Sequence, residues 1–184
     1  MLEVIVLATI ALGICTGLGF VVMMFVYFQS GPLRLGDQAM STAMLIGGLC
    51  QFVGFCMGVG SSITCDVISI GLFALSNAMF WSARVAHGAN RPAAVFGGEV
   101  PAMVVRGGPY RFVRHPFYAA YILYFVGLAV AGNWWWQYAI AFVVAILYDQ
   151  AARQEERLML ASPSVGLSYS EYYHRTWRWL PLVW

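Results

Sequence analysis

The sequence contains no lysine, and charged residues of any kind are scarce in it. Only 10% of its 184 residues are charged and 61% are hydrophobic, whereas a soluble domain carries about 25% charged and about 45–50% apolar residues. This composition excludes an ordinary water-soluble domain and indicates a membrane protein with several spans. All ten basic residues are arginine, and they form no dense basic face with interleaved aromatic residues. A nucleic-acid partner is therefore not expected.

Paired metal-ligating cysteines are also missing. The four cysteines, Cys15, Cys50, Cys56 and Cys65, lie in or beside apolar segments without a CxxC pair. Such cysteines usually serve as small buried hydrophobic residues, so no metal site is expected. The sequence also lacks a glycine-rich dinucleotide fingerprint, and we interpret Gly107 and Gly108 as part of a turn.

Long hydrophobic runs occupy most of the chain. They predict an all-α, polytopic membrane helical bundle with five transmembrane helices, over about residues 4–28, 41–60, 66–85, 117–132 and 134–152. A span of about 20 apolar residues crosses a hydrocarbon core of about 30 Å. The first run is too long for a signal-peptide core and Glu3 stands where a basic leader is expected, which favours a retained helix.

The segments between these runs predict how the helices are connected. Turn residues over 30–38 predict the first loop, and the short polar link over 61–66 predicts that the second and third helices are antiparallel neighbours. Asn133 predicts a tight hairpin between the last two spans. The fifth helix has no stop signal and should continue into RQEERLML (153–160). We divide the chain into residues 1–86, with three spans, and residues 87–184, with a long loop, the hairpin and a tail.

The distribution of arginine predicts the orientation in the membrane. With five spans, the first loop, the third loop and the C-terminal tail share one side. That side carries every arginine, namely Arg34, Arg84, Arg91, Arg106, Arg111, Arg114, Arg153, Arg157, Arg175 and Arg178. Positively charged loops stay in the cytoplasm. We therefore expect the N-terminus outside, the C-terminus in the cytoplasm, and an inner membrane of a bacterium or archaeon.

Two polar segments should meet at this cytoplasmic side. One covers residues 106–118, and the other covers 153–157 together with the tail at 169–181. Any single arginine here can be explained by snorkelling to lipid phosphates. That explanation does not account for the adjacent Glu155 and Glu156. Neighbouring helical residues point about 100° apart, so at least one of the two carboxylates should face inward.

The same segments carry a resemblance to a known family. The stretch GPYRFVRHPFY (108–118), an apolar hairpin, RQEERLM (153–159) and a Y…Y…R…P tail resemble the isoprenylcysteine carboxyl methyltransferase family. That family belongs with the phospholipid methyltransferases. The similarity covers about residues 105–181, and the RHPxY core combined with a downstream Glu-Glu pair makes it specific.

The resemblance implies a C-terminal cytoplasmic site for S-adenosylmethionine, with S-adenosylhomocysteine as the product. The implied cofactor-binding residues are Tyr110, Arg114, His115, Pro116, Tyr118, Glu155 and Glu156. A carboxylate would accept hydrogen bonds from the cofactor ammonium or ribose, and Arg114 with His115 would hold its carboxylate. The tyrosines offer aromatic faces to adenine or to the sulfonium, and Pro116 suits the first turn of a helix.

The implied catalytic residues are Arg175 and Glu156. Arg175 would orient the carboxylate of an acceptor that enters from the bilayer, and Arg178 is the alternative for that role. His87, Arg91 and Glu99 either cap the cofactor or lie on the surface.

The acceptor is expected to be a lipophilic small molecule or a prenylated group, with membrane lipids around it. The closest activity is carboxyl methylation of an isoprenylcysteine. The alternatives are methylation of a phospholipid amine or a small thiol, an NADPH-dependent membrane sterol-type reductase, and a non-enzymatic membrane protein such as a scaffold or transporter.

Overall fold

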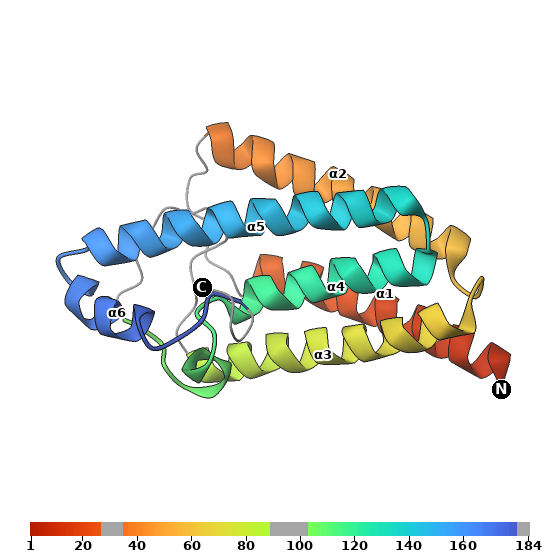
Figure 1. Cartoon of the computed structure of the whole chain (residues 1–184), viewed down its shortest axis with the longest axis horizontal. Coiled ribbons are helices and arrows are strands. Elements are labelled where there is room, and N and C mark those ends of the chain that lie inside the picture. The colour runs from red at the N-terminus through yellow and green to blue at the C-terminus, as the bar shows by residue number, and fades with distance from the viewer. Residues whose placement is uncertain (27–34, 89–102, 180–184) are drawn as a thin grey trace.

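All the regular elements in the described part of the chain are helices. The structure is a computed structural model that describes residues 1–26, 35–88 and 103–179. Its elements are α1 (Leu2–Val26), α2 (Leu35–Gly58), α3 (Ile63–His87), the short 3-10 helix η1 (Gly108–Arg111), α4 (Pro116–Gly132), α5 (Trp135–Ala161) and α6 (Gly166–Tyr173). Five long helices thus occupy the positions of the five predicted spans, and successive ones run in opposite directions (Figure 1).

Two of these helices, over Leu2–Met23 and Ile63–His87, are long and apolar enough to cross a membrane. The stretches Met44–Gly58 and Pro116–Gly132 are apolar but shorter. The predicted crossing of the membrane by all five helices stays a prediction. The predicted first loop is too long by four residues, because 35–38 already belong to α2. The rest of that loop, up to residue 34, lies outside the described residues.

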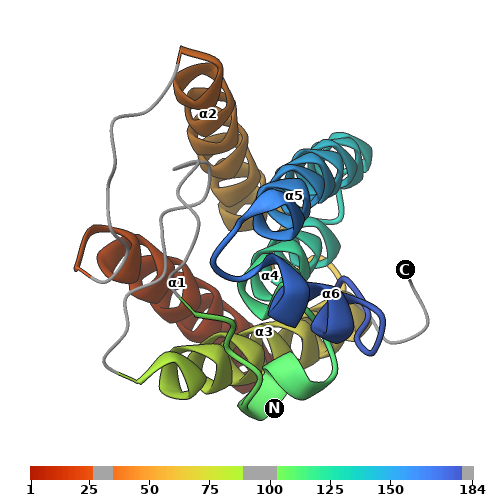
Figure 2. The same cartoon turned by 90° about the vertical axis from the view of Figure 1, so that its left-hand side faces the viewer.

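α4 is the central helix of the bundle. It packs against α1, α2, α3 and α5, and it occupies the middle of the end-on view (Figure 2). α2 and α3 run antiparallel, as predicted (Figure 1), but the prediction that they are neighbours is wrong over most of their length. They meet at the T-shaped pair Phe55 and Phe73, with ring centroids 6.2 Å apart. Beyond that point the main contacts of α2 are with α4 and α5, while those of α3 are with α1 and α4.

The α4–α5 hairpin forms as the sequence predicts. Pro116 is the first residue of α4, where a missing backbone N–H leaves no hydrogen bond unmade. Asn133 ends α4 in the left-handed conformation, with φ 55°, and its N–H donates to the carbonyl of Ala129. Asparagine tolerates this conformation better than other non-glycine residues. α5 then runs without a break through Glu155 and Glu156, as predicted from the absence of a stop signal.

The bundle has two chemically different ends. We call the end with the α2–α3 and α4–α5 turns the turn end, and the end where α3 and α5 finish and α4 begins the polar end. At the turn end, Gly58 lies against the backbone of Gly132 so closely that a Cβ on Gly58 would overlap the Gly132 carbonyl. Two fully buried glutamines join α2 to α5 there. Gln51 Nε2 donates to the Gln137 carbonyl at 2.6 Å, and Gln137 Nε2 donates to the Gln51 carbonyl at 3.0 Å.

Candidate functional site

The polar end holds a buried ionic cluster, which we call the Glu156 cluster, formed by Arg114, His115, Glu156 and Arg178. Each of the four residues is at most 6% exposed. Arg114 Nε lies 2.8 Å from Glu156 Oε1, and Arg178 Nη2 lies 2.8 Å from Glu156 Oε2. His115 Nε2 lies 3.3 Å from Glu156 Oε1. One carboxylate from α5 therefore joins the start of α4 to the C-terminal tail.

Backbone pairing brings the two arginines to the same carboxylate. Val113 and Trp177 form an isolated parallel β-bridge. Within it the Arg114 N–H donates to the Trp177 carbonyl at 2.7 Å, and the His115 N–H donates to the Arg178 carbonyl at 3.0 Å. The pairing holds the segment before α4 and the tail side by side, so that Arg114 and Arg178 approach Glu156 from two chain segments.

Arg114 also fastens the tail directly. Its Nη1 donates to the carbonyl of Tyr173 at 3.0 Å and to the carbonyl of Thr176. Its guanidinium lies over the Tyr173 ring, 4.3 Å from the centroid, as a cation–π contact. The Nε and Nη1 donors are thus engaged within the protein, and Arg114 connects α5, the start of α4 and the tail.

The electrostatics of the cluster favour the charged forms of its members. Burial by itself would raise the pKa of Glu156, but hydrogen bonds from His115, Arg178 and Arg114 lower that pKa to about 2. Burial by itself would lower the pKa of His115, but its two glutamate neighbours raise that pKa above 6.5. Opposite charges at contact distance account for both directions.

Glu155 differs from its neighbour in exposure. Its side chain is 40% exposed, against 4% for that of Glu156. Tyr118 Oη donates to Glu155 Oε2 at 2.9 Å, and His115 Nδ1 lies 3.5 Å from the same oxygen. Burial by itself would raise the pKa of Glu155. The contacts with His115 and Tyr118 have the larger effect, so the pKa of Glu155 is lowered. Both contacts use Oε2, so within the described residues the Oε1 atom of a charged carboxylate is left for a ligand.

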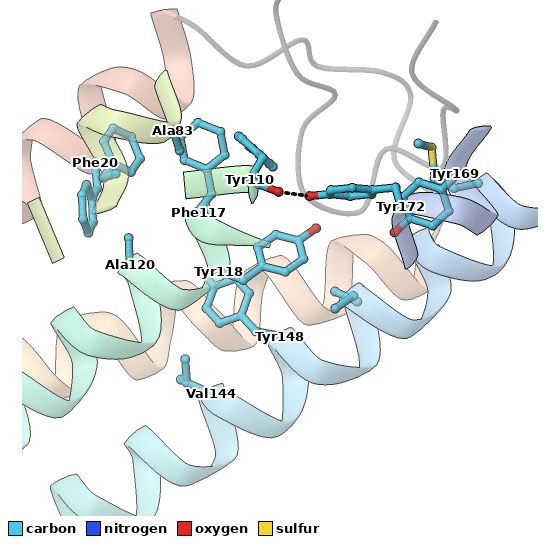
Figure 3. Packing of buried hydrophobic residues seen from close by; sticks show 14 of the residues in the cluster. Phe20, Ala83, Tyr110, Phe117, Tyr118, Ala120, Val144, Tyr148, Tyr169 and Tyr172 are labelled. Atoms are coloured by element: carbon cyan, nitrogen blue, oxygen red, sulfur yellow. Dashed lines mark hydrogen bonds between the residues drawn. The ribbon is translucent and has the colours of Figure 1, made fainter. Parts of the chain in front are cut away.

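A column of aromatic rings leads from these carboxylates into the bundle. The His115 and Tyr118 rings are stacked, 5.1 Å apart and within 4° of parallel. Tyr118 in turn stacks on Tyr148 at 5.3 Å, and Tyr148 on Tyr121 at 5.5 Å. Figure 3 shows Tyr118 and Tyr148 side by side between α4 and α5. Charged residues therefore lie at one end of this column of aromatic rings.

Tyr110 is fixed from two sides on the adjacent face of the site. Its hydroxyl lies 2.8 Å from His87 Nε2, at the end of α3. Its carbonyl accepts a hydrogen bond from Tyr172 Oη at 2.8 Å, drawn as the dashed line in Figure 3. The side chain of Tyr110 is thus held within the core instead of projecting freely.

Contacts join five of the seven predicted cofactor-binding side chains, namely Arg114, His115, Tyr118, Glu155 and Glu156. Tyr110 contacts His87 instead, and Pro116 is buried at the start of α4. The two tail arginines separate clearly. Arg175 is exposed, whereas Arg178 is 6% exposed and sits on Glu156. His87 contacts Tyr110, and Arg91 and Glu99 lie outside the described residues.

Asp149 takes a part in the cluster that was not predicted from the sequence. Arg178 Nη1 lies 3.1 Å from Asp149 Oδ1, and Arg153 Nε lies 2.6 Å from Asp149 Oδ2. The seven-residue spacing of Asp149 and Glu156 puts both carboxylates on one face of α5. That spacing was a usable signal for a shared cationic partner.

Asn77, a polar residue within the third span, donates to the carbonyl of Phe73 and to Thr16 Oγ1 in α1, which indicates helix packing.

Comparison with known proteins gives a family for the chain. Residues 64–162, more than half of the sequence, match the family described as phospholipid methyltransferase. The match spans all of α3 except its first residue and the whole of α4 and α5, and so includes Arg114, His115 and Glu156. No curated protein matches the sequence.

Proposed function

Because the chain belongs to the phospholipid methyltransferase family, we propose that it is an S-adenosylmethionine-dependent methyltransferase of the membrane, acting on a lipophilic acceptor. One observation carries this proposal beyond the family match. A partly exposed carboxylate, Glu155, stands beside a buried and fully paired one, Glu156, at the mouth of an aromatic column. A carboxylate that keeps one oxygen without a partner among the described residues, next to aromatic faces, suits a cationic, heteroaromatic ligand.

The residues present fit this cofactor. Glu155 Oε1 would accept from the cofactor ammonium or from its ribose hydroxyls, while Tyr118 holds the other oxygen in place. Tyr118 and Tyr110 would offer aromatic surface to the adenine or the sulfonium. The cofactor supplies a methyl group on a sulfonium, which is already a good leaving group. The tasks left to the protein are therefore alignment and exclusion of water.

We assign Glu156 and Arg178 to positioning, since their polar atoms are engaged by one another and by Arg114, His115 and Asp149. Glu156 fixes His115, and His115 in turn contacts Glu155. This assignment revises the implied catalytic role of Glu156. Loss of Glu156 would therefore act on the cofactor indirectly, through the placement of His115 and Glu155.

For the acceptor we propose a lipid that enters from the bilayer. An isoprenylcysteine carboxylate is the first candidate, from the resemblance of 108–118 and 153–159. An arginine would have to orient it, and among the two tail arginines only Arg175 has its side chain exposed. A phospholipid amine is the second candidate. It is favoured by the family match and by a site whose free polar atom is a carboxylate oxygen.

We further propose that the polar end faces the cytoplasm, where the cofactor is available, and that the N-terminus lies outside. The one-sided distribution of arginine supports this orientation. An inner membrane of a bacterium or archaeon is the proposed location. The family match favours methyl transfer over the NADPH-dependent reductase and over a non-enzymatic role.

Calorimetric titration of the detergent-purified protein tests the cofactor. We expect S-adenosylmethionine and S-adenosylhomocysteine to bind and NADPH not to bind. Glu155→Gln removes the charge but keeps the shape. We expect it to weaken S-adenosylhomocysteine binding about tenfold or more, since a hydrogen bond to a charged group contributes roughly 1.5–3 kcal/mol.

Glu171→Gln is the matched control, because Glu171 is an exposed glutamate on α6. It should bind like the wild type. Absence of binding by both methyl-donor species in the wild type would refute the proposed function. Unchanged binding in Glu155→Gln would refute the role of Glu155 while leaving the function standing.

A further inference from the structure

A groove lies on the outer face of the bundle, beside the last turns of α3. It has a volume of about 590 Å³ and is lined by Ala78, Trp81, Ser82, Val85, Ala86 and Gly108. This volume falls within the roughly 300–1,000 Å³ typical of small-molecule sites. Its lining is mostly apolar, and two of the apolar side chains are well exposed, Trp81 at 45% and Val85 at 76%. The groove thus presents apolar side chains outward at the polar end of a candidate membrane span.

The spacing of the lining residues explains why the groove faces outward. Ala78, Trp81, Ser82 and Val85 follow the i, i+3, i+4, i+7 pattern of one helix face. The residues Phe73, Ser76, Phe80 and Ala83, on the other face of α3, are fully buried against the bundle. Ala78, Trp81, Ser82 and Val85 are themselves exposed, whereas Ala86 packs against the core.

Gly108 forms the second wall by bringing η1 close to α3. It has φ 57°, which glycine adopts without strain. A Cβ at this position would lie 3.2 Å from the Cβ of Ala86 and 3.6 Å from the carbonyl oxygen of Ser82. A larger residue would push η1 away from α3, so the shape of the groove depends on a glycine here.

The groove ends next to the candidate active site. Gly108 begins η1, and two residues later Tyr110 contacts His87 at 2.8 Å. The His87 ring packs on Phe117, with centroids 5.8 Å apart. Phe117 precedes Tyr118, whose hydroxyl donates to Glu155. A single layer of side chains thus connects the wall of the groove to the residues proposed to hold the cofactor.

We propose that this groove binds the hydrocarbon chain of the methyl acceptor and directs its head group toward the His87–Tyr110 pair. The inference rests on the proposed function and adds to it a location for the acceptor. Three observations point to a lipid chain as the occupant. The groove lies on a helix long and apolar enough to cross a membrane, its lining is mostly apolar, and its wall at Gly108 belongs to η1, which also carries Tyr110.

Ala78→Trp tests the proposal by filling the groove from an exposed position. Methyl transfer is measured with N-acetyl-S-farnesylcysteine and with dioleoyl phosphatidylethanolamine, each beside a short-chain analogue with the same head group. We expect KM for the long-chain acceptor to rise about tenfold, as for other changes in a hydrophobic pocket. Turnover of the short-chain analogue and the affinity for S-adenosylhomocysteine should not change.

Ala11→Trp is the matched control, since it places the same side chain at an exposed position of α1. It should leave both KM values unchanged. If KM for the long-chain acceptor were unchanged in Ala78→Trp, the proposal that the groove binds the acceptor chain would be wrong. Failure of the wild type to bind the methyl donor would instead overturn the proposed function.

A readout that does not require turnover uses phosphatidylethanolamine with a photoactivatable diazirine in its acyl chain, crosslinked in the presence of S-adenosylhomocysteine. Labelling concentrated on residues 78–86, and reduced in Ala78→Trp, supports the proposal. Labelling spread equally over the exposed residues of α1 and α3 indicates general lipid contact and refutes it.

Discussion

Both ends of the bundle contain buried polar groups, but the chemistry of these groups differs between the ends. At the turn end, Gln51 and Gln137 exchange hydrogen bonds with each other's carbonyls, and Gly58 contacts Gly132 directly. These amides are neutral, and among the described residues Gln137 Oε1 has no hydrogen-bond partner. The turn end also holds one buried carboxylate, Asp66, whose Oδ1 accepts a hydrogen bond from the Gly60 N–H at 3.3 Å. At the polar end, one buried carboxylate, Glu156, is surrounded by three cationic side chains, and an adjacent carboxylate keeps an oxygen available.

This difference supports the proposal that the polar end binds a ligand, whereas the turn end contributes to stability. Neutral amide pairs fix helix register at low electrostatic cost. Buried ions are expensive to desolvate and add little net stability over apolar packing. The polar end holds the buried or half-buried charged side chains Arg114, His115, Asp149, Glu155, Glu156 and Arg178. Their desolvation cost supports the proposal that they serve a purpose beyond folding.

The strongest test of this contrast removes the central charge of the polar end. Glu156→Gln leaves Arg114 and Arg178 with a neutral partner in a buried site. Breaking a buried pair costs about 3–5 kcal/mol, so we expect a large drop in the unfolding midpoint of the detergent-solubilised protein. S-adenosylhomocysteine affinity should fall with it. Glu3→Gln, an exposed glutamate at the start of α1, is the control. A Glu156→Gln protein as stable as this control would contradict the importance of the cluster.

A second test changes only the turn end. Gly58→Ala would place a Cβ against the backbone of Gly132, where no side-chain motion relieves the overlap. Overpacking costs about 1–3 kcal/mol, so the unfolding midpoint should fall while the affinity for S-adenosylhomocysteine stays the same. Gly71→Ala is matched to it, because nothing lies within 4 Å of a Cβ at Gly71. If Gly58→Ala weakened cofactor binding more than it lowered stability, the separation of the two ends would be wrong.

The smallest expected effect is a dependence on pH that only the polar end should show. The pKa of His115 is raised above 6.5 in the folded protein. The stability that its charge contributes is therefore fully present below pH 6.5, and it is lost as pH rises through the folded value. We expect the unfolding midpoint to fall over this range, and the same step to vanish in His115→Gln. An identical pH profile in both proteins would exclude His115 as its source.

Local sequence patterns predicted those features that depend on local interactions. Pro116 at the start of α4, Asn133 at its end and the continuation of α5 through Glu155 and Glu156 all follow from backbone preferences within a few residues. The inward placement of one of the two glutamates follows from helix geometry. These predictions are confirmed because nothing distant competes with them.

Other features depend on contacts that the sequence does not specify. The tail has no regular period, so nothing in it distinguishes Arg175 from Arg178. The parallel bridge between Val113 and Trp177 decides that Arg178 turns inward. The short link between α2 and α3 likewise predicted that these helices are neighbours, whereas each of them packs mainly against other helices, α4 among them. Tertiary contacts set both outcomes.

The attachment of the tail to the segment before α4 has a consequence for how the protein is made. Arg114 and Thr176 are 62 residues apart in the chain, and the α4–α5 hairpin lies between them. Closing so long a loop is entropically unfavourable until that hairpin has formed and brought its ends together. During biosynthesis, helices already inserted in the membrane would therefore not yet possess a complete site. The proposed ability to bind the methyl donor would arise only after the tail emerges from the ribosome and docks.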